Sequence, residues 1–161
     1  MAKRLIFFLF TILSCSNLLA STVEDCFCFI QNLTDQASKQ MEELAQQEGI
    51  KKIADGLYIK TLNEGTGSEV LSENDSPLVT LKVYELKPGG DNHPYVVDNP
   101  KKINLSHCIP GIRAGVAGMK LGEMRRIYIH PSIGHGELHP FFSSEVVYYD
   151  MEIVSLNREI Q

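Results

Sequence analysis

The chain has 161 residues, of which 43% are hydrophobic and 22% charged, a composition typical of one globular domain with short extensions. A balance of 15 basic against 20 acidic residues gives a formal net charge of -5, and no basic cluster is longer than a pair such as Arg125 and Arg126. Nucleic acid is therefore excluded as an expected partner, because domains that bind it carry a basic patch.

The N-terminal segment has the pattern of an export signal. Lys3 and Arg4 form a positive start, residues 5–13 are an apolar run with one Thr, and small or polar residues follow through Ala20. The apolar run is too short to span a membrane comfortably. We therefore expect residues 1–20 to be a signal peptide and the mature protein to be exported to the periplasm or cell envelope.

The processing site of this signal has two interpretations. Cleavage after Ala20 leaves Leu18 at the minus-three position, where a smaller residue is usual. The alternative is lipoprotein processing at Cys15, because Ile12, Leu13 and Ser14 form a loose version of the bacterial lipobox. Acylation of Cys15 would tether the protein to a membrane, whereas cleavage after Ala20 would discard this cysteine.

Residues 21–48 contain no Pro or Gly and predict an amphipathic helix, the main part of a helical arm over residues 21–52. Ser21 and Glu24 fit a capping box, and Gly49 is a suitable stop. The apolar stripe has three interpretations: it docks on the chain's own domain, it belongs to a stalk, or it is the seam of a coiled-coil dimer. The stripe consists of Val23, Cys26, Phe27, Ile30, Leu33, Ala37, Met41, Leu44 and Ala45.

Beyond Cys15, the cysteines are odd in number and define no disulfide framework. Cys26 and Cys28 are separated by one residue, which is not the spacing of a redox Cys-x-x-Cys motif, and Cys108 lies far away in the sequence. Two interpretations stay open: all three are small buried hydrophobic residues, or one of the first two pairs with Cys108.

The globular domain is expected to begin near Ile53, and several short strands follow. Val79, Leu81 and Val83 alternate with polar residues, so this strand should bury one face and direct Val83, not Tyr84, inward. The closing strand alternates in the same way at Val147, Tyr149, Met151 and Ile153. The expected strands cover residues 57–62, 79–84, 95–97, 102–105, 124–129 and 145–154.

Residues 108–136 contain the one internal helix and the densest group of turn signals. Ile109, Pro110 and Gly111 form a turn that opens a helix over residues 112–119, and residues 120–123 turn the chain into the strand 124–129. His130 and Pro131 end that strand, and a loop with Gly134, His135 and Gly136 follows. The pattern predicts an α+β fold, an antiparallel sheet of five to six strands wrapped around one short helix.

This order and spacing resemble the FK506-binding-protein (FKBP) type of peptidyl-prolyl cis-trans isomerase over about residues 56–157. An exported helical arm before such a domain is similar to the macrophage-infectivity-potentiator type, although this arm is shorter. The resemblance implies an FKBP-like domain over residues 53–157 with a tail at 158–161. The matching positions are Ile109, Pro110, Gly111, Gly115, Met119, Gly122, Glu123, Arg125, Ile129, Pro131 and Gly136.

The resemblance also implies a function. Such a protein rotates Xaa–Pro bonds of proline-containing polypeptides in an apolar pocket and assists protein folding. Rotation needs hydrophobic walls and a hydrogen-bond donor, but no nucleophile, so no metal or organic cofactor is implied. His135 and His139 lie in a loop without a carboxylate or thiol cluster, and no metal site is predicted there.

The site residues are carried over by position. His135 stands where the family has a donor Tyr, Tyr149 where it has an inward Phe, and Ile109 where a backbone amide meets the ligand. Ile112 takes the place of the aromatic floor. The implied catalytic residues are His135, Tyr149 and Ile109, and the implied substrate-binding residues are Val83, Tyr95, Ile109, Ile112, Phe141 and Tyr149.

Two of these positions leave the function open. Ile112 gives no flat stacking surface, and the imidazole of His135 has a shorter reach than a Tyr hydroxyl. The alternative to an isomerase is therefore an FKBP-like binding or chaperone module with weak or no isomerase activity. A third interpretation is an envelope protein whose N-terminal helix binds a partner.

Overall fold

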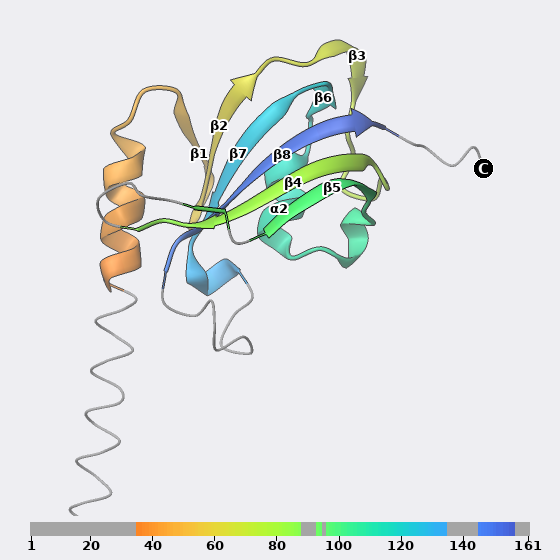
Figure 1. Ribbon diagram of the computed structural model, residues 1–161. Coiled ribbons are helices and arrows are strands. Elements are labelled where there is room, and N and C mark those ends of the chain that lie inside the picture. The colour runs from red at the N-terminus through yellow and green to blue at the C-terminus, as the bar shows by residue number, and fades with distance from the viewer. Residues whose placement is uncertain (1–34, 88–92, 95, 135–144, 157–161) are drawn as a thin grey trace, which may run out of the picture.

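The computed structural model describes residues 35–87, 93–94, 96–134 and 145–156. Its centre is an antiparallel six-stranded sheet with the strand order β1-β2-β7-β8-β4-β5, and β3 pairs with β6 in a separate two-stranded sheet (Figure 1). The strands are β1 Ile50–Ala54, β2 Leu57–Asn63, β3 Thr66–Val70, β4 Leu78–Glu85, β5 Val96–Lys102, β6 Lys120–Leu121, β7 Met124–Ile129 and β8 Val147–Ser155.

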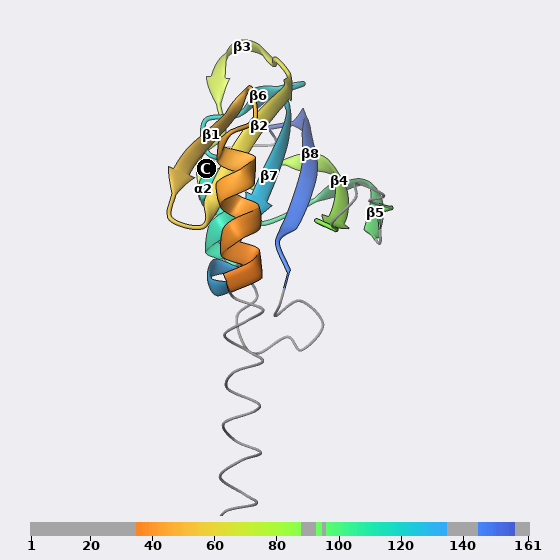
Figure 2. The ribbon, with the colours of Figure 1, turned by 90° about the vertical axis from the view of Figure 1, so that its left-hand side faces the viewer.

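Helices cover both faces of this sheet. Helix α2, Pro110–Val116, lies on one face, which we call the inner face, and the N-terminal helix, described over residues 35–45, lies on the opposite or outer face (Figure 2). Two short 3₁₀ helices, η1 Leu105–His107 and η2 Pro131–Ile133, precede α2 and follow β7. The expected α+β fold, a sheet of five to six strands around one short helix, is confirmed.

The inner face carries the main hydrophobic core. Alternate residues of the central strands face it and most of them are buried; Val83 is 5% exposed and faces inward as the alternation predicted. The core consists of Leu57, Ile59, Leu71, Val79, Val83, Leu105, Ile112, Val116, Met119, Ile127, Ile129, Val147, Tyr149, Met151 and Ile153.

The outer face carries a row of tyrosines. The strand registers pair Tyr58 with Tyr128, Tyr128 with Tyr148, and Tyr148 with Tyr84, so the four rings lie side by side across β2, β7, β8 and β4. The rings of Tyr84 and Tyr148 stack with centroids 4.6 Å apart. These positions are not solvated, as they would be on an uncovered sheet, because the N-terminal helix packs on them.

The N-terminal helix uses its apolar stripe for this contact. Ala37, Met41 and Leu44 are buried and share one hydrophobic cluster with three of the tyrosines and with Val146. Of the three arrangements left open by the sequence, the described part of the helix therefore adopts docking on the chain's own domain.

An ion pair lies beside the tyrosine row on the outer face. The guanidinium of Arg126 donates to both carboxylate oxygens of Asp150, with N···O distances of 2.6 and 2.7 Å, and lies 4.6 Å from the centroid of the Tyr148 ring. Asp150 is 5% exposed. Hydrogen bonding to this carboxylate raises the pKa of Arg126 above its usual value, so the guanidinium stays charged.

Several element boundaries differ from the sequence expectation. Strand β1 begins at Ile50, before residue 53, where we expected the domain to begin, and the N-terminal helix ends at residue 45 instead of 48. The internal helix spans Pro110–Val116 and not 112–119, and β8 begins at Val147.

The expected strand over residues 102–105 is wrong. Strand β5 ends at Lys102, and the carboxamide oxygen of Asn104 accepts from the backbone N–H of Ser106 at 3.0 Å. This local cap starts η1 and draws Leu105 into a 3₁₀ turn, where its side chain is fully buried.

The two edge strands of the main sheet are poor partners for a further strand. In β1, Lys51 and Lys52 are exposed, and a register shift interrupts the pairing between Lys52 and Ala54. Strand β5 contains Pro100, followed by the exposed Lys101.

Two glycines allow α2 to lie directly on β7. A Cβ atom at Gly111 would be 2.9 Å from Cδ1 of Ile129, and one at Gly115 would be 2.5 Å from Cγ2 of Ile127. Both distances are shorter than van der Waals contact, so a larger residue would push the helix away from the strand. Glycine at these positions therefore sets the depth of the space between α2 and the sheet.

We expect Gly115→Ala to destabilise the fold by about 1 to 3 kcal/mol, despite the better helix propensity of Ala, because the added methyl overpacks against Ile127. Urea unfolding followed by circular dichroism measures this. Equal stability of Gly115→Ala and wild type would contradict the close approach.

Candidate functional site

The candidate site lies where the start of α2 meets the inner face of the sheet. Ile109 is the N-cap residue of α2, and its carbonyl oxygen accepts from the backbone N–H groups of Ile112 and Arg113 at 3.0 and 3.2 Å. Pro110 follows at the first helical position, where its fixed backbone angle and missing N–H are no disadvantage. The Ile-Pro-Gly turn therefore opens the helix as expected.

Arg125 of β7 fixes the other end of this helix. Its Nη1 donates to the carbonyl oxygens of Gly115 and Ala117 at 2.8 and 3.2 Å, and its Nε donates to Oε1 of Glu123 at 2.9 Å. Glu123 in turn accepts from the backbone N–H of Lys120 at 3.0 Å. Because both side chains are buried, this network holds α2 against β7 from the carboxyl end of the helix.

Four of the residues predicted for the site lie together. Val83, Ile112 and Tyr149 are buried in the inner cluster, Ile109 packs against it, and Val83 is paired with Tyr149 across β4 and β8. They form an apolar wall with one hydroxyl group. The other three predicted residues, Tyr95, His135 and Phe141, lie outside the described part of the chain.

Tyr149 is the polar component of this wall. Burial raises the pKa of its phenol to about 12, and the nearby Cys108 thiol acts in the same direction. The hydroxyl group is therefore neutral at physiological pH and able to donate a hydrogen bond. The Phe that the FKBP family has at this position offers only its ring and cannot donate such a bond.

The sequence did not assign two neighbours of the wall, Cys108 and Ile133. Both are half-buried and pack against the inner cluster. Cys108 is a free thiol whose Sγ lies 3.5 Å from the carbonyl oxygen of Asn104, and burial raises its pKa. Ile133 is brought there by η2, since the ring of His130 accepts from the N–H of Ser132 and turns the chain after β7. In the sequence, Pro131 was the residue that could have indicated the turn leading to Ile133.

The described residues contain no group of three or more His, Cys, Asp or Glu side chains placed to hold a metal ion. Chemically, the wall brings aliphatic side chains and one phenol hydroxyl group together beside the start of a helix.

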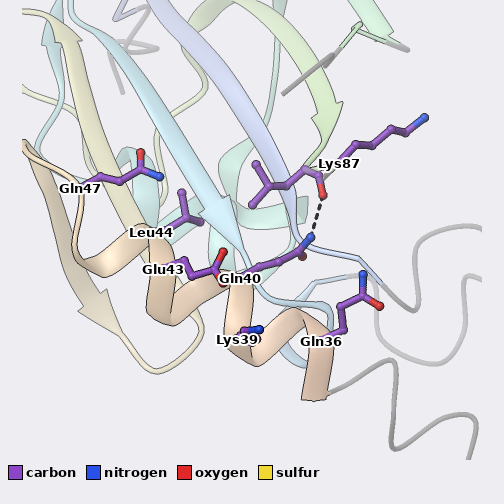
Figure 3. Close-up of a pocket in the computed structure, with 8 residues that line it drawn as sticks. Gln36, Lys39, Gln40, Glu43, Leu44, Gln47 and Lys87 are labelled. Atoms are coloured by element: carbon purple, nitrogen blue, oxygen red, sulfur yellow. Dashed lines mark hydrogen bonds between the residues drawn. The ribbon is translucent and has the colours of Figure 1, made fainter. Parts of the chain in front are cut away.

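A pocket of about 370 Å³ lies elsewhere, between the N-terminal helix and the end of β4 (Figure 3). Its lining is mainly polar or charged, including Gln36, Lys39 and Glu43, with Leu44 and Leu86 as the apolar contribution. It is on the outer side of the sheet, away from the wall formed by Ile109, Ile112 and Tyr149. We therefore do not place the candidate site there.

Comparison with known proteins identifies the domain. Residues 94–154 match the family FKBP_C, described as FKBP-type peptidyl-prolyl cis-trans isomerase. The matched part of the chain is similar to FKBP-type domains. The matched range includes β5, α2, β7 and most of β8, so Ile109, Ile112 and Tyr149 fall within it, whereas Val83 of β4 lies before it.

The relatives place this FKBP-type domain near the Mip isomerases. The chain is 27% identical over 129 residues to the peptidyl-prolyl cis-trans isomerase Mip of Chlamydia trachomatis, covering 75% of this chain and 50% of the relative. It is 24% identical over 131 residues to the Mip protein of Chlamydia pneumoniae, covering 76% and 48%. The chain spans about half the length of these relatives.

Solved structures agree on the FKBP-type fold. A peptidyl-prolyl cis-trans isomerase from Pseudomonas syringae superposes with a TM-score of 0.70 at 17% identity, covering 80% of this chain and 96% of that one. FkpA from Escherichia coli superposes with a TM-score of 0.62 at 20% identity, covering 78% and 59%. At these identities the likeness shows the fold.

The raised pKa of Tyr149 predicts a loss of stability at alkaline pH. Below pH 10 the phenol is protonated in both the folded and the unfolded state, so its full contribution to the free energy of unfolding is present. Between pH 10 and 12 the unfolded chain loses this proton while the folded protein keeps it, so the free energy of unfolding falls. Urea unfolding at about pH 9 and about pH 11 measures the drop, which we expect to be smaller in Tyr149→Phe. An equal drop in both proteins would contradict the burial of this phenol.

Proposed function

We propose that this protein is an exported peptidyl-prolyl cis-trans isomerase that assists protein folding by rotating Xaa–Pro bonds. The observation that carries the proposal is the wall of Val83, Ile112 and Tyr149 beside Ile109, within an FKBP-type domain. The named activity of the Mip relatives supports the same function.

The physical basis is the resonance of the amide. Rotation about a peptide bond is opposed by about 18 to 20 kcal/mol, and Xaa–Pro bonds isomerise over tens to hundreds of seconds. An apolar site that fits the twisted amide better than either planar form lowers this barrier without a covalent step. In the proposed complex the proline ring packs against Ile112 and Tyr149. The amide of Ile109, the hydroxyl of Tyr149 and the imidazole of His135 donate to substrate carbonyl groups.

A second candidate function is a binding or chaperone module that turns over poorly. One observation favours it: Tyr149 is the one aromatic residue of the described inner core, and the other described tyrosines of the central strands are on the outer face. With Ile112 at the floor, the described wall offers a proline ring less aromatic surface than the family pattern does. Affinity for proline segments with slow turnover would follow.

Export is part of the proposal and depends on the N-terminal pattern of Lys3, Arg4 and the apolar residues 5–13. No helix within the described residues is long and apolar enough to cross a membrane. Mass spectrometry of the mature N-terminus decides between cleavage after Ala20 and acylation of Cys15. It also decides between a released protein and one that is tethered.

Exchange NMR on a short Xaa–Pro peptide tests the isomerase function. We expect the wild-type protein to accelerate cis-trans exchange and His135→Ala to reduce the acceleration at least about tenfold, since it removes a donor to the twisted carbonyl. The matched control is His107→Ala, an exposed histidine in η1, which should behave as wild type.

If the wild-type protein accelerates cis-trans exchange for none of the tested residues before proline, the isomerase function is excluded. Binding of the same peptide without acceleration would then establish the second candidate. Full acceleration in His135→Ala would remove this imidazole from the mechanism.

A further inference from the structure

The N-terminal helix contacts the sheet at the end where the candidate site lies. Besides its apolar stripe, the described part of this helix makes polar contacts from Ser38 and Gln40, and each reaches the end of a central strand.

Ser38 contacts the residue that ends β7. Its Oγ lies 3.3 Å from Nε2 of His130, which directly follows Ile129. Nδ1 of the same ring accepts from the backbone N–H of Ser132 at 3.1 Å, so in the neutral imidazole the proton is on Nε2 and is donated to Ser38.

The backbone N–H of His130 donates to the carbonyl oxygen of Gly56 at 2.8 Å. His130 is therefore fixed from both its ring and its backbone. Ile129 before it and Ile133 after it both contact the inner cluster.

Gln40 contacts the residue that follows β4. Its Nε2 donates to the carbonyl oxygen of Leu86 at 3.0 Å, the contact drawn as a dashed line in Figure 3. The backbone N–H of Leu86 donates in turn to the carbonyl oxygen of Val146 at 2.8 Å. Val146 belongs to the outer cluster, and the next residue, Val147, belongs to the inner one. A chain of two hydrogen bonds thus joins the helix to the start of β8.

We propose that Ser38 and Gln40 are positioning residues for the isomerase reaction, an inference that rests on the function proposed above. They connect the N-terminal helix on the outer face to the ends of β7 and β4 and to the start of β8; β4 and β8 carry Val83 and Tyr149 of the wall, and β7 leads to its neighbour Ile133. Through His130 they place Ile129 and Ile133, and through Leu86 and Val146 they place Val147 and, two residues later, Tyr149.

A purely stabilising role for Gln40 is a poor explanation of its geometry. Its Oε1 is buried and has no hydrogen-bond partner within the described part of the chain, which costs stability. Gln40→Met removes this unpaired oxygen together with the bond to Leu86 while keeping the length of the side chain. Removing the unpaired oxygen favours stability, whereas removing the bond to Leu86 affects positioning. The two effects can therefore be measured separately in this variant.

The experiment compares Ser38→Ala/Gln40→Met with wild type by exchange kinetics and by backbone amide chemical shifts without substrate. We expect kcat/KM to fall about three- to tenfold well below the melting temperature, because a displaced wall fits the twisted amide less well. We also expect the amide resonances of Ile129, Ile133, Val147 and Tyr149 to move. Ser38→Thr/Gln40→Lys, which keeps a hydroxyl and a donor, should restore both.

Two controls separate positioning from stability. Lys39→Ala, on the exposed side of the same helix, should change neither measurement. Ile153→Val, a buried substitution at the far end of β8, should lower the melting temperature and leave kcat/KM and the four resonances unchanged. Unchanged resonances in Ser38→Ala/Gln40→Met overturn the proposal whatever the activity. If the wild type has no activity, the isomerase function fails, and the resonances alone decide whether the helix positions the wall.

Discussion

The close approach of α2 to β7 is the constraint on which the rest of the structure depends. Gly111 and Gly115 remove the side chains that would separate helix and strand, and Arg125 binds the last carbonyl groups of the helix from β7. The helix is only seven residues long and would not be stable alone. Its position, and with it the position of Ile109 and Ile112, is therefore set by the sheet.

The outer face shows how the same strands serve a second purpose. An FKBP-type sheet with one helix would leave Tyr58, Tyr128 and Tyr148 at a solvated surface. Here the N-terminal helix covers them, so the central strands are buried on both sides. A sheet packed on both faces is stiff. Because protein interiors are close-packed, displacing side chains on one face also shifts the side chains on the other. The described aromatic residues of the outer face support the scaffold, while the described part of the site is mostly aliphatic.

The fold was largely predictable because its signals are local. The Ile109-Pro110-Gly111 turn, the strand 124–129 and the alternation at Val147, Tyr149 and Met151 each specify an element with little help from the rest of the chain. Alternation also placed Val83 inward correctly.

The failures have tertiary causes. Strand β1 is short and mostly exposed and exists through its pairing with β2, and Leu105 was drawn out of a strand by the Asn104 cap. The wall of the site followed from family position and alternation together. Cys108 and Ile133 reach it through turns whose direction the sequence does not encode.

The protection of the sheet edges has a consequence for the protein in a crowded solution. An exposed strand edge is a template on which any extended chain can add by backbone pairing, and this is a common start of aggregation. The lysines and the register shift of β1, and Pro100 and Lys101 of β5, oppose this growth at both ends of the sheet. Contact with extended polypeptides is thereby directed away from the backbone of this sheet and toward side-chain surfaces.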